Sequence, residues 1–323
     1  MIRAAISVAL CFPLLGSAGA FPQQPADGPR GQSIKVTSSA VDVYAIVEGR
    51  RGQLIRDLSK DNFEITDDGT PQKIINFSQE TNTALSLGIA IDTSVSQGQL
   101  LGMEQGAAKI FLASVLQRAD RAFVMNFDVD VKLLKDFTNS PAELAHAIDS
   151  AEINRTGRSV LPEGTARPAG GTHLYDAVYL ASNELMKERV GRKVLVLVTD
   201  GQDQGSKINL QKSIESAEKS DVIVYSIIVS DPEFYSLLGG TYHGDSSIRK
   251  LDLETGGRTI RLKSIDEIGS AFDQIARELR AQYLLGYSPS NLRHDGSFRR
   301  IRVTVRKHNC RVRTRTGYYD HSN

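Results

Sequence analysis

The pattern of apolar and polar positions divides the chain into three regions. Residues 33–80 and 281–319 alternate apolar with polar positions, which is typical of short strands with one buried face. Residues 84–280 instead contain continuous apolar runs separated by amphipathic segments. Such runs are typical of parallel strands that helices cover on both faces. The pattern predicts a central α/β domain with a β segment before it and another after it.

The first β region contains a strand and a hairpin. Apolar side chains alternate along Val41–Val47. After a strand around Phe63, the segment Asp67-Asp68-Gly69 is a strong hairpin turn, and Ile74–Phe77 is the expected return strand.

The middle region alternates strands with helices. Its first strand is the apolar run Leu85–Ile91. The further strands are predicted at Ala122–Phe127, Val131–Phe137, Lys193–Thr199, Val222–Val229 and Arg258–Leu262. The helices are predicted at Gln99–Leu116, Pro141–Ser150, His173–Lys187, Leu210–Lys219, Ile248–Glu254 and Ile265–Leu279. This alternation favours an α/β fold with a doubly wound, mostly parallel sheet flanked by helices.

The last region returns to strands, predicted at Tyr283–Tyr287, Ile301–Val305 and Val312–Tyr318. Neither β region is large enough to hold a core of its own. We therefore expect residues 33–80 and 281–319 to pair into one small β-sandwich, with the α/β domain inserted in its sequence. Two separate β appendages are the alternative.

The N-terminus has the pattern of a signal peptide. Arg3 precedes an apolar run over Ala4–Leu15, and Ala18-Gly19-Ala20 fits a cleavage site. The run is shorter than the ~20 residues that span a bilayer. A Pro/Gly/Gln-rich linker at residues 21–32 disfavours the alternative of a buried N-terminal helix. We expect residues 1–20 to be removed and the mature protein to be periplasmic or secreted.

Composition and charge disfavour several classes of protein and structural feature. In the 323-residue chain, 39 Lys and Arg balance 38 Asp and Glu, which disfavours a globally basic nucleic-acid binder. Removal of residues 1–20 would leave Cys310 as the only cysteine, so no intramolecular disulfide is expected. No other apolar stretch is long enough for a membrane span.

Two predicted strands are followed directly by an aspartate. Asp92 follows Leu85–Ile91, and Asp200 follows Lys193–Thr199. Ligands of an open α/β sheet bind beyond the carboxyl ends of its strands, where the strand order reverses, so we expect these carboxylates to meet. Nearby hydroxyl groups reach the same edge. The candidate metal-binding set is Asp92, Ser94, Ser96, Thr172 and Asp200.

All five candidate side chains supply oxygen, which suits Mg²⁺, Mn²⁺ or Ca²⁺ rather than zinc. Two carboxylates balance the charge of a divalent cation, and the hydroxyls add none. Such a cation keeps an open position that a carboxylate of a partner protein could fill. The alternative is that these residues cap helices and form turns, as Asp, Ser and Thr often do. Capping would not require three separate loops to converge.

The segment Asp92-Thr93-Ser94-Val95-Ser96, with Thr172 and Asp200, resembles the metal-ion-dependent adhesion site (MIDAS) of von Willebrand factor type A domains. Segments Val198–Gly201 and Leu253–Arg258 are also similar to that family, and the resemblance spans about residues 84–280. It implies protein binding that depends on a divalent cation, with Mg²⁺ as the first candidate. It further implies that Ser94, Ser96 and Thr172 are direct ligands, whereas Asp92 and Asp200 often act through water.

The flanking segments resemble a secreted bacterial subfamily described only as von Willebrand factor A-related. The segments that carry this resemblance are Asn62–Gln72, Gln282–Pro289 and Phe298–Val303. The resemblance indicates architecture more than biological role.

These features predict an exported, non-enzymatic, metal-dependent binding module that coordinates an acidic residue of a protein partner. The alternative is a structural or assembly factor of the envelope, in which the metal serves stability and the β-sandwich binds the partner. Two kinds of enzyme fit poorly. Ser94 stands where a haloacid-dehalogenase-type phosphotransferase needs a second aspartate, and the G-x-S-x-G elbow of serine hydrolases is absent from the sequence.

The C-terminal strands are strongly basic. Nine cationic residues stand there against Asp295 alone: Arg293, Arg299, Arg300, Arg302, Arg306, Lys307, Arg311, Arg313 and Arg315. They could form a face that binds an anionic polymer. Their alternation with Ile301, Val303 and Val305 favours a simpler interpretation, the solvated side of a strand pair.

Overall fold

The computed structural model describes residues 40–79, 83–154, 158–159, 167–168, 171–229, 245–307 and 309–320. Residues Ser39–Asn323 form one compact unit. The predicted signal peptide and linker lie outside the described residues. No helix within the described ranges is long and apolar enough to cross a membrane.

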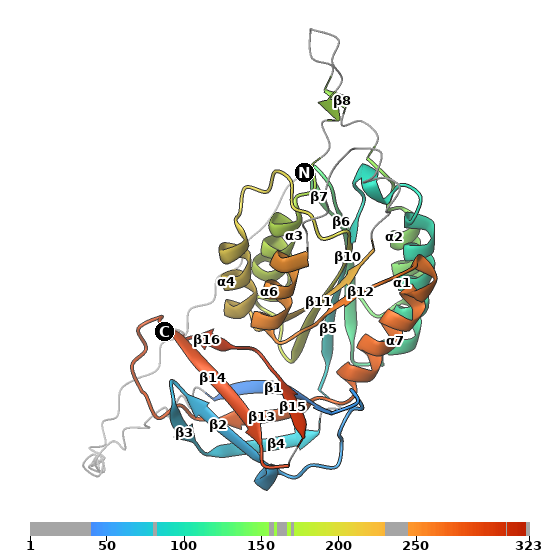
Figure 1. The fold of residues 1–323 in the computed structure, drawn as a ribbon. Coiled ribbons are helices and arrows are strands. Elements are labelled where there is room, and N and C mark those ends of the chain that lie inside the picture. The colour runs from blue at the N-terminus through green and yellow to red at the C-terminus, as the bar shows by residue number, and fades with distance from the viewer. Residues whose placement is uncertain are drawn as a thin grey trace, which may run out of the picture. The chain divides into compact units, whose positions relative to one another are not determined.

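Six strands form the central sheet (Figure 1). In spatial order they are β12 (Thr259–Arg261), β11 (Val222–Ile228), β10 (Arg192–Thr199), β5 (Leu85–Asp92), β6 (Arg121–Phe127) and β7 (Val131–Thr138). Neighbouring strands are parallel except for β7, which runs antiparallel to β6. Strands β5, β10 and β11 are buried along their whole length, because helices cover both faces. The predicted doubly wound, mostly parallel sheet is confirmed.

Two groups of helices cover the two faces of this sheet (Figure 1). One group is α1 (Leu101–Val115), α2 (Pro141–Asp149) and α7 (Ile268–Leu279). The other is α3 (Leu174–Leu180), α4 (Leu210–Lys219) and α6 (Asp245–Thr255). A π-helical segment, Ala181–Met186, continues α3, and short 3₁₀ turns lie at Lys60–Asn62, Val95–Gln97 and Ile265–Glu267. Each group forms its own apolar core with the sheet face beneath it.

Strands from the two β regions form two further sheets of four strands each. One sheet is β15 (Cys310–Arg313), β1 (Val41–Gly49), β13 (Tyr283–Tyr287) and β4 (Ile74–Gln79). The other is β16 (Gly317–Tyr319), β14 (Phe298–Val305), β2 (Phe63–Asp67) and β3 (Thr70–Gln72). A third apolar core contains side chains of both sheets, such as Val43 and Val303. The predicted pairing of N-terminal with C-terminal strands into a β-sandwich is therefore confirmed.

Two strand predictions within this sandwich are wrong in detail. Asp68 and Gly69 do turn the chain with positive φ angles of 46° and 81°, but the return strand is β3, not Ile74–Phe77. Pro71 has no N–H to donate, and β3 remains a three-residue edge strand. Ile74 then begins β4 in the opposite sheet, where it pairs with Tyr287 of β13.

The predicted strand Val312–Tyr318 is likewise two strands in different sheets, β15 and β16. The chain crosses between the sheets at residues 314–316. There the main chain of Arg315 lies so close to Gly256 that a Cβ on that glycine would meet it. Tertiary contact with the α/β domain interrupts a segment that looks continuous in sequence.

Candidate metal centre

The first candidate carboxylate, Asp92, is the last residue of β5. Strands β5 and β10 are parallel neighbours, with Ile91 paired to Val198, so Asp92 and Thr199 come next in register. The Thr199 hydroxyl donates a 2.6 Å hydrogen bond to Asp92 Oδ2. The Ser94 backbone N–H donates to Asp92 Oδ1 at 2.9 Å. Asp92 is fully buried at the carboxyl end of the sheet, as predicted for a residue at this position.

A row of hydroxyl groups connects this strand end to the next one. Ser94 Oγ and Ser96 Oγ lie 3.0 Å apart, and Ser96 Oγ donates a 2.7 Å hydrogen bond to Asp200 Oδ2. Asp200 directly follows β10 and is 2% exposed. Four of the five predicted side chains, Asp92, Ser94, Ser96 and Asp200, thus lie together at one edge of the sheet.

Thr172, the fifth candidate, lies on the segment that leads into α3. Two backbone hydrogen bonds of 2.9 Å pair Thr172 with Gln204, four residues beyond Asp200. The Thr172 side chain is buried. The structure therefore joins the Thr172 segment to the loop that carries Asp200 through main-chain contacts.

Burial and nearby negative charge change the acidity of two carboxyl groups at this edge of the sheet, those of Asp92 and Glu104. Burial, and next the negative charge of Asp200, raise the pKa of Asp92 to about 7. Glu104 of α1 is also fully buried, and its Oε2 atom has no hydrogen-bond partner. Burial, and then the charges of Asp92 and Asp200, raise the pKa of the Glu104 carboxyl well above its usual range. The ionised forms of Asp92 and Glu104 are therefore poorly stabilised by the protein at this edge of the sheet.

A second set of polar side chains holds the loops around the site and was missed in the sequence. Asp128 accepts hydrogen bonds from Thr93 Oγ1 at 2.8 Å and from Asn154 Nδ2 at 2.9 Å. Asn126 Nδ2 donates to the same Thr93 hydroxyl at 2.9 Å. A signal was present, because Asp128 follows β6 directly, just as Asp200 follows β10.

The residues present fit a hard divalent cation. Their donors are carboxylate and hydroxyl oxygens, and no nitrogen or sulfur donor belongs to the set. Within the described part of the chain, no cluster of three or more His, Cys, Asp or Glu side chains is arranged to hold a metal ion. A cation here would therefore depend on the hydroxyls as well as on the two carboxylates.

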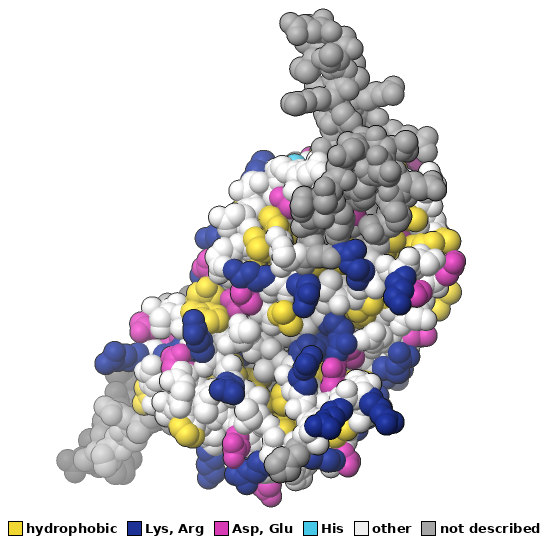
Figure 2. Space-filling model, viewed as in Figure 1, with side chains coloured by type: hydrophobic (Ala, Val, Ile, Leu, Met, Phe, Trp, Pro, Cys, Tyr) yellow, Lys and Arg dark blue, Asp and Glu magenta, His cyan; other side chains and the backbone are white. Residues whose placement is uncertain are grey.

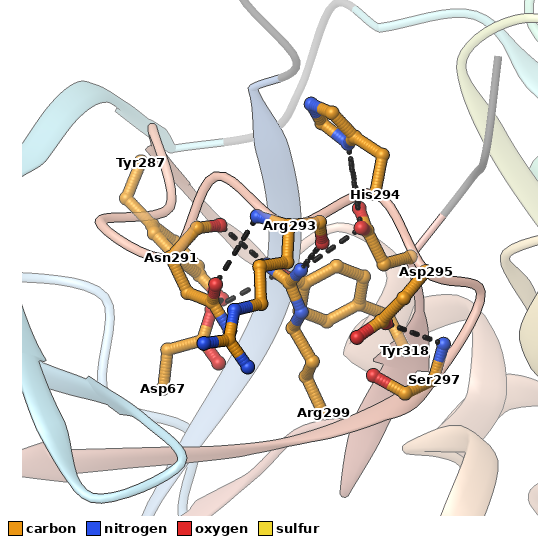
Figure 3. A network of polar contacts seen from close by, with 10 residues as sticks. Asp67, Tyr287, Asn291, Arg293, His294, Asp295, Ser297, Arg299 and Tyr318 are labelled. Atoms are coloured by element: carbon orange, nitrogen blue, oxygen red, sulfur yellow. Dashed lines mark hydrogen bonds and ion pairs between the residues drawn. The ribbon is translucent and has the colours of Figure 1, made fainter.

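A separate polar network lies inside the β-sandwich (Figure 3). Asp67 Oδ2 accepts hydrogen bonds from the hydroxyls of Tyr287 at 2.9 Å and Tyr318 at 3.0 Å. Arg299 is 1% exposed and its Nη2 lies 2.9 Å from Asp320 Oδ2. Its guanidinium also donates to backbone carbonyls of the loop before β14. These contacts tie that loop to the sandwich, which indicates a structural role.

Most of the predicted basic face is paired with acidic side chains. On the face drawn in Figure 2, Lys and Arg side chains are spread over the surface with Asp and Glu between them. Five of the nine C-terminal cations form ion pairs: Arg299 with Asp320, Arg306 with Glu64, Lys307 with Asp57, Arg313 with Glu48 and Glu278, and Arg315 with Asp221. This pairing reduces the net charge that the strands offer to an anionic polymer.

Comparison with known sequences finds a family that matches part of the chain. The family described as von Willebrand factor type A domain matches residues 87–202. This span includes most of β5, all of β10, and both Asp92 and Asp200. The predicted resemblance is confirmed at the level of this domain, and the complete adhesion-site motif remains a prediction. No curated protein matches the sequence.

Some solved structures are similar to this chain at low identity. Proximal thread matrix protein 1 from the mussel byssus, solved with a zinc-occupied MIDAS motif, is 16% identical with a TM-score of 0.50. The match covers 67% of this chain and 50% of that chain. The vWF domain of the type V pili tip protein Mfa5 from Porphyromonas gingivalis is 13% identical, with a TM-score of 0.43 and coverage of 61% and 95%. An aerotolerance-related membrane protein from Bacteroides fragilis is 17% identical, with a TM-score of 0.44 and coverage of 60% and 98%.

Proposed function

We propose that this protein is a binding module whose attachment to a protein partner depends on a divalent cation held by Asp92, Ser94, Ser96, Thr172 and Asp200. The observation that carries the proposal is the hydrogen-bonded row from Asp92 through Ser94 and Ser96 to Asp200. Loops far apart in sequence bring these oxygens to the carboxyl edge of the central sheet. A cation bound there would interact with carboxylates that now accept hydrogen bonds from hydroxyl groups.

The donor set also supports the kind of partner. Two carboxylates balance a divalent charge, and three neutral hydroxyls complete the ligand sphere only in part. A cation held in this way retains affinity for a further anionic oxygen. We therefore propose that the partner is a protein that presents an Asp or Glu carboxylate, and that Mg²⁺ is the first cation to test.

We further propose that the protein is exported and acts by binding rather than by catalysis. The N-terminal signal-peptide pattern supports export. The absence from the sequence of a P-loop, a nucleophile elbow or an HExxH pattern supports a binding role.

The cation site is tested by calorimetric titration of the chelator-treated protein with Mg²⁺, Mn²⁺, Ca²⁺ and Zn²⁺. We expect one ion to bind per chain, and Asp92→Ala and Asp200→Ala to abolish binding. Asp252→Asn is the matched control. Asp252 of α6 is also fully buried, but its carboxylate accepts hydrogen bonds from Ser226 of β11 at 2.9 Å and from Thr259 of β12 at 2.5 Å. Binding that survives in both site variants would overturn the proposed ligand set.

The partner is tested by co-purification from the native source with and without chelator. A specific partner retained only with the cation, and lost by the folded Asp92→Ala variant, supports the proposal. A partner that binds equally well to Asp92→Ala favours the alternative, a structural or assembly factor that binds through the β-sandwich. Binding of an anionic polymer to the C-terminal strands has less support, because four of their arginines already form ion pairs with acidic side chains.

A further inference from the structure

The apolar face of α1 carries one side chain that the packing of the core does not explain. Its buried positions are Leu101, Glu104, Ala107, Ala108, Phe111, Leu112 and Val115. Glu104 is the only charged member of this set, and it is 0% exposed. A leucine or glutamine of similar size would fill the same space without the cost of burying an ionisable group.

Glu104 points toward the candidate metal centre through one intermediate residue. The Gln97 side chain is also 0% exposed, and its amide lies between Glu104 of α1 and Asp200, which follows β10. With its nitrogen toward the helix, Gln97 donates to Glu104 Oε1 at 3.1 Å and its oxygen accepts from the Asp200 N–H at 3.1 Å. Glu104 is therefore linked to the main chain of one proposed ligand.

The second Glu104 oxygen has neither a hydrogen-bond partner nor an ion-pair partner in the described part of the chain. Oε2 is buried without a hydrogen-bond partner, and no described Lys, Arg or His forms an ion pair with this carboxylate. A buried carboxylate without such partners is strongly destabilising unless a cation or a proton compensates it. Asp92 and Asp200 are close enough to raise the pKa of Glu104, so a cation held by them would also be close enough to stabilise its charge.

We propose that Glu104 is a positioning residue of the cation site, a third carboxylate that binds no metal itself. It supplies negative charge from behind Asp92 and Asp200 and fixes the Asp200 main chain through Gln97. This inference rests on the proposed cation site and assigns to it a residue outside the five ligands. Because Glu104 occupies no coordination position, it strengthens the hold on the cation and still leaves a position for a partner carboxylate.

The test compares two variants that separate charge from shape. Glu104→Gln keeps the size of the side chain and removes the charge. We expect the affinity for Mg²⁺ or Mn²⁺, measured by calorimetry, to fall about 10–100-fold, as for other residues that orient metal ligands. The melting temperature of the chelator-treated variant should equal or exceed that of the wild type, because an uncompensated buried acid is gone.

Glu104→Asp keeps the charge and shortens the side chain. We expect it to retain more cation affinity than Glu104→Gln, while its metal-free melting temperature falls because a cavity is left in the core. The control is Glu278→Gln, another buried glutamate, which pairs with Arg258 and Arg313 at the end of α7. That control should lose metal-free stability and keep the wild-type cation affinity.

The outcomes separate this inference from the proposed function. If the wild type binds a cation that Asp92→Ala abolishes, and Glu104→Gln binds it equally well, the role of Glu104 is overturned and the site stands. If Glu104→Gln loses affinity and metal-free stability together, Glu104 is a packing residue and the inference also fails. If the folded wild type binds none of the cations, both the site and the role of Glu104 are overturned.

Discussion

Ser96 Oγ donates a 2.7 Å hydrogen bond to Asp200 Oδ2, which joins the ends of two neighbouring strands across 104 residues of sequence. We predict that Ser96→Ala weakens cation binding strongly and the fold only slightly. The lost hydrogen bond is worth about 0.5–1.5 kcal/mol of unfolding free energy, whereas the cation loses a ligand. Calorimetry and denaturant unfolding measure the two effects. Ser114→Ala removes a similar hydroxyl bonded to Phe111 O within α1, and it should leave the affinity for the cation unchanged.

Removal of the cation should lower the thermal stability of the protein. A ligand at 100 times its dissociation constant stabilises the folded state by about 2.7 kcal/mol when the unfolded chain does not bind it. We therefore expect the melting temperature, followed by circular dichroism, to rise with added Mg²⁺ and to return with chelator. Asp92→Ala should show no such response. An identical response in that variant would place the stabilising cation elsewhere in the protein.

Glu218 of α4 should make the metal-free protein less stable as pH rises. Burial, and then the charge of Glu254, raise the pKa of Glu218 from 4.5 to about 8. Between these values the folded state keeps a proton that the unfolded chain releases, so the free energy of unfolding falls with increasing pH. Glu218→Gln should reduce this fall in denaturant titrations across the window, in the presence of chelator.

Glu143→Gln is the control for this pH dependence. Glu143 is exposed, and its pKa is lowered first by the hydrogen bond from Lys135 and then by the charge of Lys135. Replacing Glu143 should therefore leave the decrease of the unfolding free energy with rising pH unchanged. If the unfolding free energy falls equally steeply with pH in the wild type and in Glu218→Gln, the prediction is wrong. Other buried acids, such as Asp252 with a pKa of about 8, would then account for the pH dependence.

Arg299 should contribute to the stability of the β-sandwich. Its guanidinium is buried beside the buried carboxylate of Asp320. Arg299→Met would leave that carboxylate without its main partner, and we expect a loss of about 3–5 kcal/mol in unfolding free energy. Arg302→Met, on the exposed side of the same strand, should change stability by less than about 0.5 kcal/mol. Similar losses in both variants would contradict the distinction between buried and solvated arginines.

The sequence was sufficient to predict the order of the main strands and helices of the α/β domain, and four of the residues that meet at the site. Apolar runs such as Leu85–Ile91 identify strands buried on both faces, because only such strands have no polar side to present to water. An aspartate directly after such a strand must lie at the carboxyl edge of the sheet. Asp92 and Asp200 could therefore be placed together before any distance was known.

Only the tertiary structure decided where strands change sheets and which buried residues support the site. After the turn at Gly69 the chain pairs with β2 and then enters the opposite sheet at Ile74, and the crossing near Arg315 lies against Gly256 of the α/β domain. Local pattern does not contain these long-range contacts. Glu104 looks like an ordinary polar position of an amphipathic helix. Its proximity to Gln97 and Asp200 arises because α1 packs against the sheet, and burial and charge at a point depend on all the elements that surround it.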